Sequence, residues 1–515
     1  MKLNLKNTIL FRVFDPQWMW SSVHPASLGV VRFLFGLLMI EQTWKYERYI
    51  GGYLVHSRYL LHYDFFEWVE MLPAEWLGVL FIGMYISAIL IASGFLYRLG
   101  MVFFFLGQTY CFLLDKGHYN NHYYMISLVA FWMIFTHWNR WFSLDHEIAK
   151  AVHRSPKTGI LHQIASFLWQ KRTPKGVPRW HLLTLQLLVF VVYFFGATAK
   201  LNPDWIEAYP MRIWLEMRGD WPVFGPLIAS EGFSYFISYM GIAFDLVAAF
   251  ILFSPRVRLK LFFVVAFMLP FHLTNDYLWR IGVFPEMMLG FTLLFFDPAL
   301  PARGVTWLKA KFRRQPVKWS ATAIAQGLPL PIPRAQKLIY AVLLVFFGWQ
   351  LLFPLRIHLY PWPAEWHTNA MHFSWRMMLM DRQAATRIRV EMDGQPLGYV
   401  RMEDYFTVRQ YRKFVKDPPE IVRFAHFLAD DMVANGAPKK PEIYATVWRS
   451  INGRPYQLVM DSTANLVELP YHPAVIQDWL YPFTDSEKKD GNFRLLDDEE
   501  ARNLGFGQYL GDGPE

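Results

Sequence analysis

The sequence predicts an α-helical polytopic membrane protein with about 8–9 transmembrane helices, followed by a C-terminal α+β, β-rich extracytoplasmic domain. Three observations predict this class. Of the 515 residues, 54% are hydrophobic and 18% are aromatic. Charged residues make up only 18%, against about 25% in soluble proteins. Long apolar runs recur as far as Pro354, and alternating patterns with hairpin turns follow.

The apolar runs predict the spans. A helix needs about 20 residues to cross a hydrocarbon core of ~30 Å, and several runs are shorter, so we expect their ends to extend into flanking sequence. Nine spans is the expected count, and eight with one re-entrant or interfacial piece is the alternative. The runs are 26–40, 76–96, 99–114, 122–137, 181–199, 234–253, 259–275, 281–296 and 337–354. No cleavable signal peptide is expected, because the first 25 residues lack its apolar core.

These runs divide the chain into four parts. We expect a cytoplasmic N-terminal segment at 1–25, a transmembrane domain at 26–354, an extracytoplasmic domain at 355–484 and a polar tail at 485–515. The only cysteine, Cys111, lies in an apolar run and excludes an intrachain disulfide and a cysteine-based metal site. We interpret it as a packing residue.

The charge distribution predicts the orientation of the membrane domain. Residues 1–360 hold 33 Lys+Arg against 19 Asp+Glu, and residues 361–515 hold 18 against 23. Basic residues gather in the N-terminus and in the links 138–180, 254–258 and 298–336, which should face the cytoplasm. The excess therefore indicates membrane topology and not nucleic-acid binding. This predicted orientation places five polar residues, and everything after Pro354, at or near the outer face. The five are Lys116, His122, Lys200, His272 and Asn275.

Lys200 stands at the end of a long apolar run, before Asn202-Pro203 and the interfacial aromatic Trp205. Burial disfavours the ammonium form of a lysine, and a neutral lysine is a usable base. The alternative is a lysine that extends along the helix end to reach water.

Further polar residues lie in or beside the spans, where functional groups are expected. Arg32 and Asp245 lie in separate spans and could form a structural ion pair. His272 and Asn275 are three apart and share one helix face. Each such residue could also be a satisfied buried polar group. The other members of the set are Asp115, Lys116, Asn120, Asn121, His122 and Glu286.

The outer domain shows two predicted hairpins. Alternation over 387–392 leads through Asp393-Gly394 to 397–401, and alternation over 442–448 leads through Asn452-Gly453 to 456–460. Residues 406–435 between them predict helix, broken at Pro418-Pro419. The sequence shows no nucleophilic triad, phosphate loop or metal-ligand spacing here. An exposed sheet edge could bind an extended peptide, or the domain could only pack on the helices.

Five ordered segments together resemble the vitamin K-dependent γ-glutamyl carboxylase family, in its bacterial branch of horizontally transferred transmembrane (HTTM) proteins. The resemblance covers about residues 20–480. The segments are Arg32-Phe33-Leu34-Phe35-Gly36, Leu113-Leu114-Asp115-Lys116 with Asn120-Asn121-His122, Ala199-Lys200-Leu201 with Asp204-Trp205, Phe271-His272-Leu273-Thr274-Asn275 with Ile281-Gly282 and Phe284, and His372-Phe373-Ser374-Trp375-Arg376-Met377-Met378.

The resemblance implies a coupled reaction. A lysine base deprotonates vitamin K hydroquinone (phylloquinol or menaquinol), and addition of O2 gives a strong base that removes a glutamate γ-proton. CO2 then adds to form γ-carboxyglutamate, and vitamin K epoxide leaves. The implied partners are the lipid bilayer, a lipid quinone in a hydrophobic pocket among the helices and a glutamate-containing peptide on the outer face, with no metal. The implied location is a bacterial inner membrane, with the active site and the C-terminal domain on the periplasmic side.

The resemblance also implies roles for residues. Lys200 matches the base, and His122 matches the histidine at the glutamate. Asn121, His272 and Asn275 are implied positioning groups, and Lys116 could face a substrate carboxylate. The chain departs from the animal enzymes at Ala199, where they have a second lysine, in lacking their disulfide, and at Arg376, where they have an acidic residue. The last departure puts propeptide docking in doubt.

Two other functions stay open on the sequence. One is a quinol epoxidase or oxygenase that does not carboxylate protein. The other is a non-enzymatic transporter or lipid-binding module, for which internal repeats would be typical; the sequence shows none. Dependence on CO2 and glutamate separates the first of these from the coupled enzyme.

Overall fold

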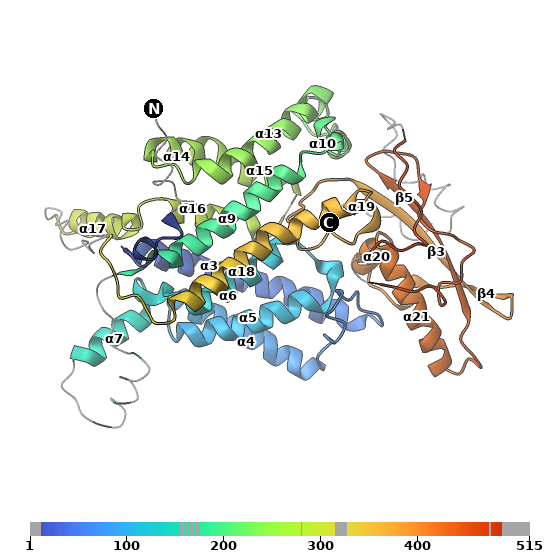
Figure 1. Ribbon diagram of the computed structural model, residues 1–515, viewed down its shortest axis with the longest axis horizontal. Helices are drawn as coiled ribbons and strands as arrows, with labels where there is room; N and C mark the ends of the chain where they lie inside the picture. The colour runs from blue at the N-terminus through green and yellow to red at the C-terminus, as the bar shows by residue number, and fades with distance from the viewer. Residues whose placement is uncertain are drawn as a thin grey trace.

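The computed structural model describes residues 12–154, 176–279, 281–314, 327–472 and 475–486, together with residues 159, 163, 166 and 169. A bundle of helices carries a smaller domain with strands at one of its ends (Figure 1). Nearly all of the predicted polar tail lies outside the described residues. So do several basic residues that predict the orientation: Lys2, Lys6, Lys157, Lys171, Arg172, Lys175 and Lys318.

Seven helices in the described part of the chain are long and apolar enough to cross a membrane. They correspond to seven of the nine predicted runs. The other two runs form shorter helices, α6 (Asn121–Phe135) and α16 (Phe284–Thr292) with its continuation to Phe295. The seven are Ala26–His56 beginning with α3 (Ala26–Tyr46), α4 (Ala74–Ser93), α5 (Tyr97–Leu114), α9 (Arg179–Ala199), α13 (Glu231–Ile251), Val257–Trp279 ending with α15 (Leu269–Trp279), and Gln336–Leu359 beginning with α18 (Gln336–Leu352).

Helices α3 and α4 pack closely, and Arg32 on α3 forms hydrogen bonds to the end of α4. A Cβ atom at Gly36 would lie 2.5 Å from the backbone nitrogen of Ala92, so only glycine allows the approach. Helix α4 ends at Ser93, before the left-handed Gly94, and the carbonyl groups of its last turn can accept further hydrogen bonds. The Arg32 guanidinium donates to the carbonyl oxygens of Ile91 and Ala92. The pairing of Arg32 with Asp245 that the sequence allowed therefore does not form.

The outer domain confirms both predicted hairpins. Its sheet has the order β4-β3-β5-β6, formed by β3 (Arg382–Met392), β4 (Gln395–Tyr399), β5 (Glu442–Ile451) and β6 (Gln457–Leu458). The turn residues Asp393, Gly394, Asn452 and Gly453 all have positive φ, as hairpin turns of this type require. The predicted helical region forms α20 (Val408–Phe414) and α21 (Pro418–Ala434), which begins at the two prolines.

A buried ion pair joins the outer domain to the helices. Asp204 lies on the short helix α10 (Pro203–Ile206) and accepts from Arg454 at 2.7 and 2.8 Å and from Asn452 at 2.7 Å. Both charged side chains are almost fully buried. Each charge therefore compensates the other where water cannot.

Replacing Arg454 by methionine is expected to destabilise the protein, because it removes the charged partner of the buried Asp204 carboxylate. Loss of one member of a buried pair costs about 3–5 kcal/mol, and thermal unfolding in detergent measures the change. The control is Lys440→Met, since Lys440 and its partner Asp430 are both exposed. Equal melting temperatures for the two variants would contradict the role given to the buried pair.

Candidate functional site

Lys200 lies where α9 ends, and its amine points into the protein. Its Nζ donates to Asp245 Oδ2 at 2.6 Å and to the carbonyl oxygen of Gly196 at 3.1 Å. Asp245 comes from α13, which packs against α9. The exposed fractions are only 8% for Lys200 and 5% for Asp245. The lysine does not extend along the helix end to water; it forms a buried ion pair between two helices.

Trp205 forms one wall beside this lysine. The side chain of Asn202 caps α10 by accepting from the backbone nitrogen of Trp205 at 3.0 Å. The indole Nε1 donates to the carbonyl oxygen of Ser238 at 2.9 Å, which fixes the ring. Lys200 Nζ lies 5.4 Å from the ring centroid, within the range of a cation–π contact. The turn-former and the aromatic that follow Lys200 in the sequence thus hold its amine in place.

His272, on α15, contacts α9 two helical turns before Lys200 and so adds to this site. Its Nε2 lies 2.8 Å from the hydroxyl of Tyr193, which is two helical turns before Lys200 and so on the same face. Its Nδ1 is buried and has no hydrogen-bond partner among the described residues. Phe244, the neighbour of Asp245 on α13, lies 6.1 Å from the His272 ring. Tyr193, on the helix that ends at Lys200, and Phe244, next to Asp245, therefore both lie against the His272 ring.

His122 borders the same region from another helix. The rings of His122 and His272 lie 6.2 and 6.3 Å from that of Phe284, so both histidines lie near one phenylalanine. The His122 Nε2 is buried and has no hydrogen-bond partner in the part of the chain that the structure describes. Gly282 has a φ of +77°, and a Cβ atom there would lie 3.4 Å from that nitrogen. Because Gly282 has no side chain, only its backbone lies beside the His122 ring.

The other candidate residues have separate positions. Asn121 donates to the carbonyl oxygen of Arg376 at 2.7 Å and accepts from the hydroxyl of Tyr119 at 2.9 Å, so its amide holds the outer domain. Asn275 is half-buried, about one turn after His272. Lys116 forms ion pairs with Asp417 at 2.8 Å and Glu420 at 2.6 Å. These two carboxylates of the outer domain already compensate its charge.

Some residues of the site have roles that the sequence does not indicate. The sequence suggests Asp245 only as a partner of Arg32. Tyr193 lies seven residues before Lys200, and this spacing on a helix is a usable signal for a shared face. The sequence gives no such signal for Lys45. A Cβ atom at Gly282 would lie 3.6 Å from Lys45 Nζ, so this amine lies on the same side of Gly282 as His122.

Two family models match the chain. The HTTM domain matches residues 20–299, and the lumenal domain of vitamin K-dependent gamma-carboxylase matches residues 335–486. The first match contains His122, Lys200 and His272, and the second contains the sheet and the helices α20 and α21. No solved structure matches the chain.

Proposed function

Because the chain belongs to the vitamin K-dependent gamma-carboxylase family, we propose that it is a membrane enzyme that carboxylates glutamate side chains of a peptide. The proposed reaction uses reduced vitamin K (phylloquinol or menaquinol), O2 and CO2 and releases γ-carboxyglutamate and vitamin K epoxide. The observation that carries the proposal is the buried Lys200–Asp245 pair, with the Trp205 ring beside the lysine amine. The proposed location is a bacterial inner membrane with the outer domain in the periplasm, which the basic residues in the opposite links support.

The residues present suit a quinol. The rings of Phe244, Phe271 and Phe284 give apolar walls near the two histidines. Buried polar atoms need partners, and the unpartnered nitrogens His122 Nε2 and His272 Nδ1 suit the oxygen atoms of a quinol or a carboxylate. When bound, reduced vitamin K with O2 supplies a base far stronger than any side chain, which a γ-carbon proton requires.

Lys200 is the proposed base. Its Nζ and Asp245 Oδ2 are 2.6 Å apart, so a proton can pass between them while the pair as a whole stays neutral. With the proton on Asp245, Lys200 presents a neutral amine, the form that can remove a proton from a quinol hydroxyl. The Trp205 ring keeps the amine at the end of α9.

His122 is the proposed donor to the glutamate. A ring N–H at Nε2 directed to the substrate stabilises negative charge as it develops on the glutamate carboxylate. His272, held by the hydroxyl of Tyr193 near Phe284, is a proposed positioning group for the substrate. The surrounding helices exclude water, which would otherwise protonate the carbanion.

The test uses purified protein in detergent with reduced vitamin K, labelled bicarbonate and a short glutamate-containing peptide. The expected result is vitamin K epoxide together with acid-stable label in the peptide. Epoxide without label, across peptides of varied sequence, would identify a quinol oxygenase instead. Neither product from folded protein would favour the non-enzymatic alternative.

A further inference from the structure

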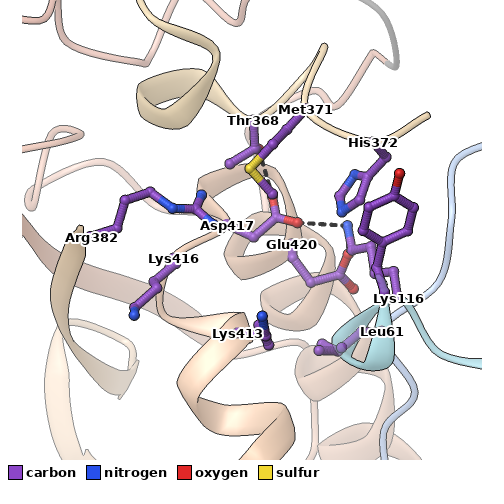
Figure 2. Close-up of a pocket in the computed structure, with 12 residues that line it drawn as sticks. Leu61, Lys116, Thr368, Met371, His372, Arg382, Lys413, Lys416, Asp417 and Glu420 are labelled. Carbon is purple, nitrogen blue, oxygen red and sulfur yellow. Dashed lines mark hydrogen bonds and ion pairs between the residues drawn. The ribbon is translucent and has the colours of Figure 1, made fainter. Parts of the chain in front are cut away.

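A cavity of about 60 Å³ lies between the helical half and the outer domain. A water needs roughly 10–15 Å³ of such space, so the cavity has room for several waters or for one carboxylate group. Figure 2 shows Lys116 on one wall, Arg382 on the opposite side, and Lys413 and Lys416 along α20 and its end. The lining residues thus come from parts of the chain that are far apart in sequence.

The cavity holds more positive than negative side chains. Four basic residues and two acidic residues line it. Lys116 forms ion pairs with both acids, Asp417 and Glu420. The remaining cations are Arg382, Lys413 and Lys416, and none of them forms an ion pair within 4.0 Å in the described residues. The Nη1 atom of Arg382 is buried and has no hydrogen-bond partner among them either.

Such an arrangement is costly without an anion. Arg382 and Lys416 are half-buried and Lys413 is exposed, and three neighbouring cations repel one another, more strongly where water is partly excluded. Desolvation, and then the charges of Arg382 and Lys413, lower the pKa of Lys416 to about 7. Lys413, which also lines the cavity, is exposed.

We propose that this cavity binds the carboxylate of an acidic peptide side chain, other than the glutamate that reacts. None of Lys200, His122 or His272 lines it. One hydrogen bond connects it to the candidate site, because Tyr119 lines the cavity and donates to Asn121, the neighbour of His122. The proposal rests on the proposed function only in taking the occupant to be a peptide.

A carboxylate fits better than a phosphate group. The planar fork of Arg382 matches both a carboxylate and a phosphate, so the acidic residues of the cavity decide between them. The carboxylates of Asp417 and Glu420 line the same cavity and would repel a doubly charged group more strongly than a singly charged one. A peptide held here by one acidic residue would have another residue free to reach His122.

Binding should depend on pH through Lys416. The peptide carboxylate stays ionised above about pH 6, whereas the ammonium of Lys416 is lost as pH rises through about 7. Between about pH 6 and pH 8 the protonated fraction of Lys416 falls about tenfold, and the affinity should fall by less, because Arg382 stays charged. The charged and titratable groups around Lys416 are Asp381 and Arg382 at β3, Lys413 on α20, Arg449 on β5, and Asp417 and His372 in the cavity.

Fluorescence anisotropy of labelled peptides, with the full chain in nanodiscs, tests the proposal. One peptide carries two glutamates, and its counterpart has one of them replaced by glutamine. Wild-type protein should bind the first at least about tenfold more tightly, as expected for a charge-assisted pair. Arg382→Gln and Lys416→Gln should remove this preference, and Lys440→Gln, at an exposed position, should keep it. Equal affinity of wild-type protein for the two peptides would overturn the proposal.

Three further measurements complete the test. Arg382→Lys keeps the charge and should retain part of the preference, and melting curves show that each variant is folded. Phosphate or acetate at millimolar concentration should compete only weakly; strong competition by phosphate would overturn the choice of a peptide carboxylate. Lys200→Ala should bind both peptides like the wild type, so loss of reaction and loss of charge-dependent binding are separate outcomes.

Discussion

Lys200→Ala is expected to lower both peptide carboxylation and epoxide formation by about 10²–10⁴, the range for loss of a general base. Both products depend on removal of a proton from the quinol, and Lys200 is the proposed base for that step. Its Nζ is held by Asp245, Gly196 and the Trp205 ring. The measurement is the initial rate of each product at saturating quinol and peptide.

Lys200→Arg is the matched control for this prediction. Arginine can keep the ion pair with Asp245, but it does not lose its proton in proteins. If Lys200 is a base, the arginine variant stays as inactive as the alanine variant while melting near the wild-type temperature. If the ion pair is only structural, arginine restores much of the activity, and the assignment of Lys200 fails.

His122→Ala is expected to uncouple the two products. Its Nε2 is buried without a hydrogen-bond partner among the described residues, and its ring, like that of His272, lies near Phe284. Loss of one donor to developing negative charge costs about 10²–10³ in rate, and the loss should fall on label in the peptide. Epoxide formation, which depends on Lys200, should fall much less. The measurement is the ratio of epoxide to γ-carboxyglutamate in one reaction.

The exposed histidine His358 supplies a control, since His358→Ala should leave the ratio unchanged. A parallel loss of both products in His122→Ala would place the histidine at the quinol instead of the glutamate. Unchanged rates for both products would remove it from the reaction.

The local elements were predictable because their signals are local. The turns Asp393-Gly394 and Asn452-Gly453 and the prolines at 418–419 define the hairpins and the start of α21 within a few residues. The match between apolar runs and helices follows from the cost of leaving backbone groups unpaired in lipid. Helices α6 and α16 are shorter than a span requires by themselves, so seven of the nine predicted runs form helices long enough to cross a membrane in the described part of the chain.

The partners of charged residues were not predictable in the same way. Arg32 and Asp245 have opposite charges in separate helices, but pairing depends on which helix faces meet. Helix α3 packs against α4, whose last carbonyls attract Arg32, and α13 packs against α9, which brings Asp245 to Lys200. Lys116 likewise meets acids from the distant outer domain. The site residues could be proposed from the sequence, whereas their contacts could not.

Exchange of the γ-hydrogen of glutamate tests the central claim most directly. The peptide, deuterated at the γ-carbon, is incubated with the protein, reduced vitamin K and O2 in the absence of CO2, and deuterium loss is followed by mass spectrometry. The account predicts loss that requires both quinol and O2 and disappears in Lys200→Ala. Epoxide formation with full retention of deuterium would contradict it, because the quinol reaction would then proceed without acting on glutamate.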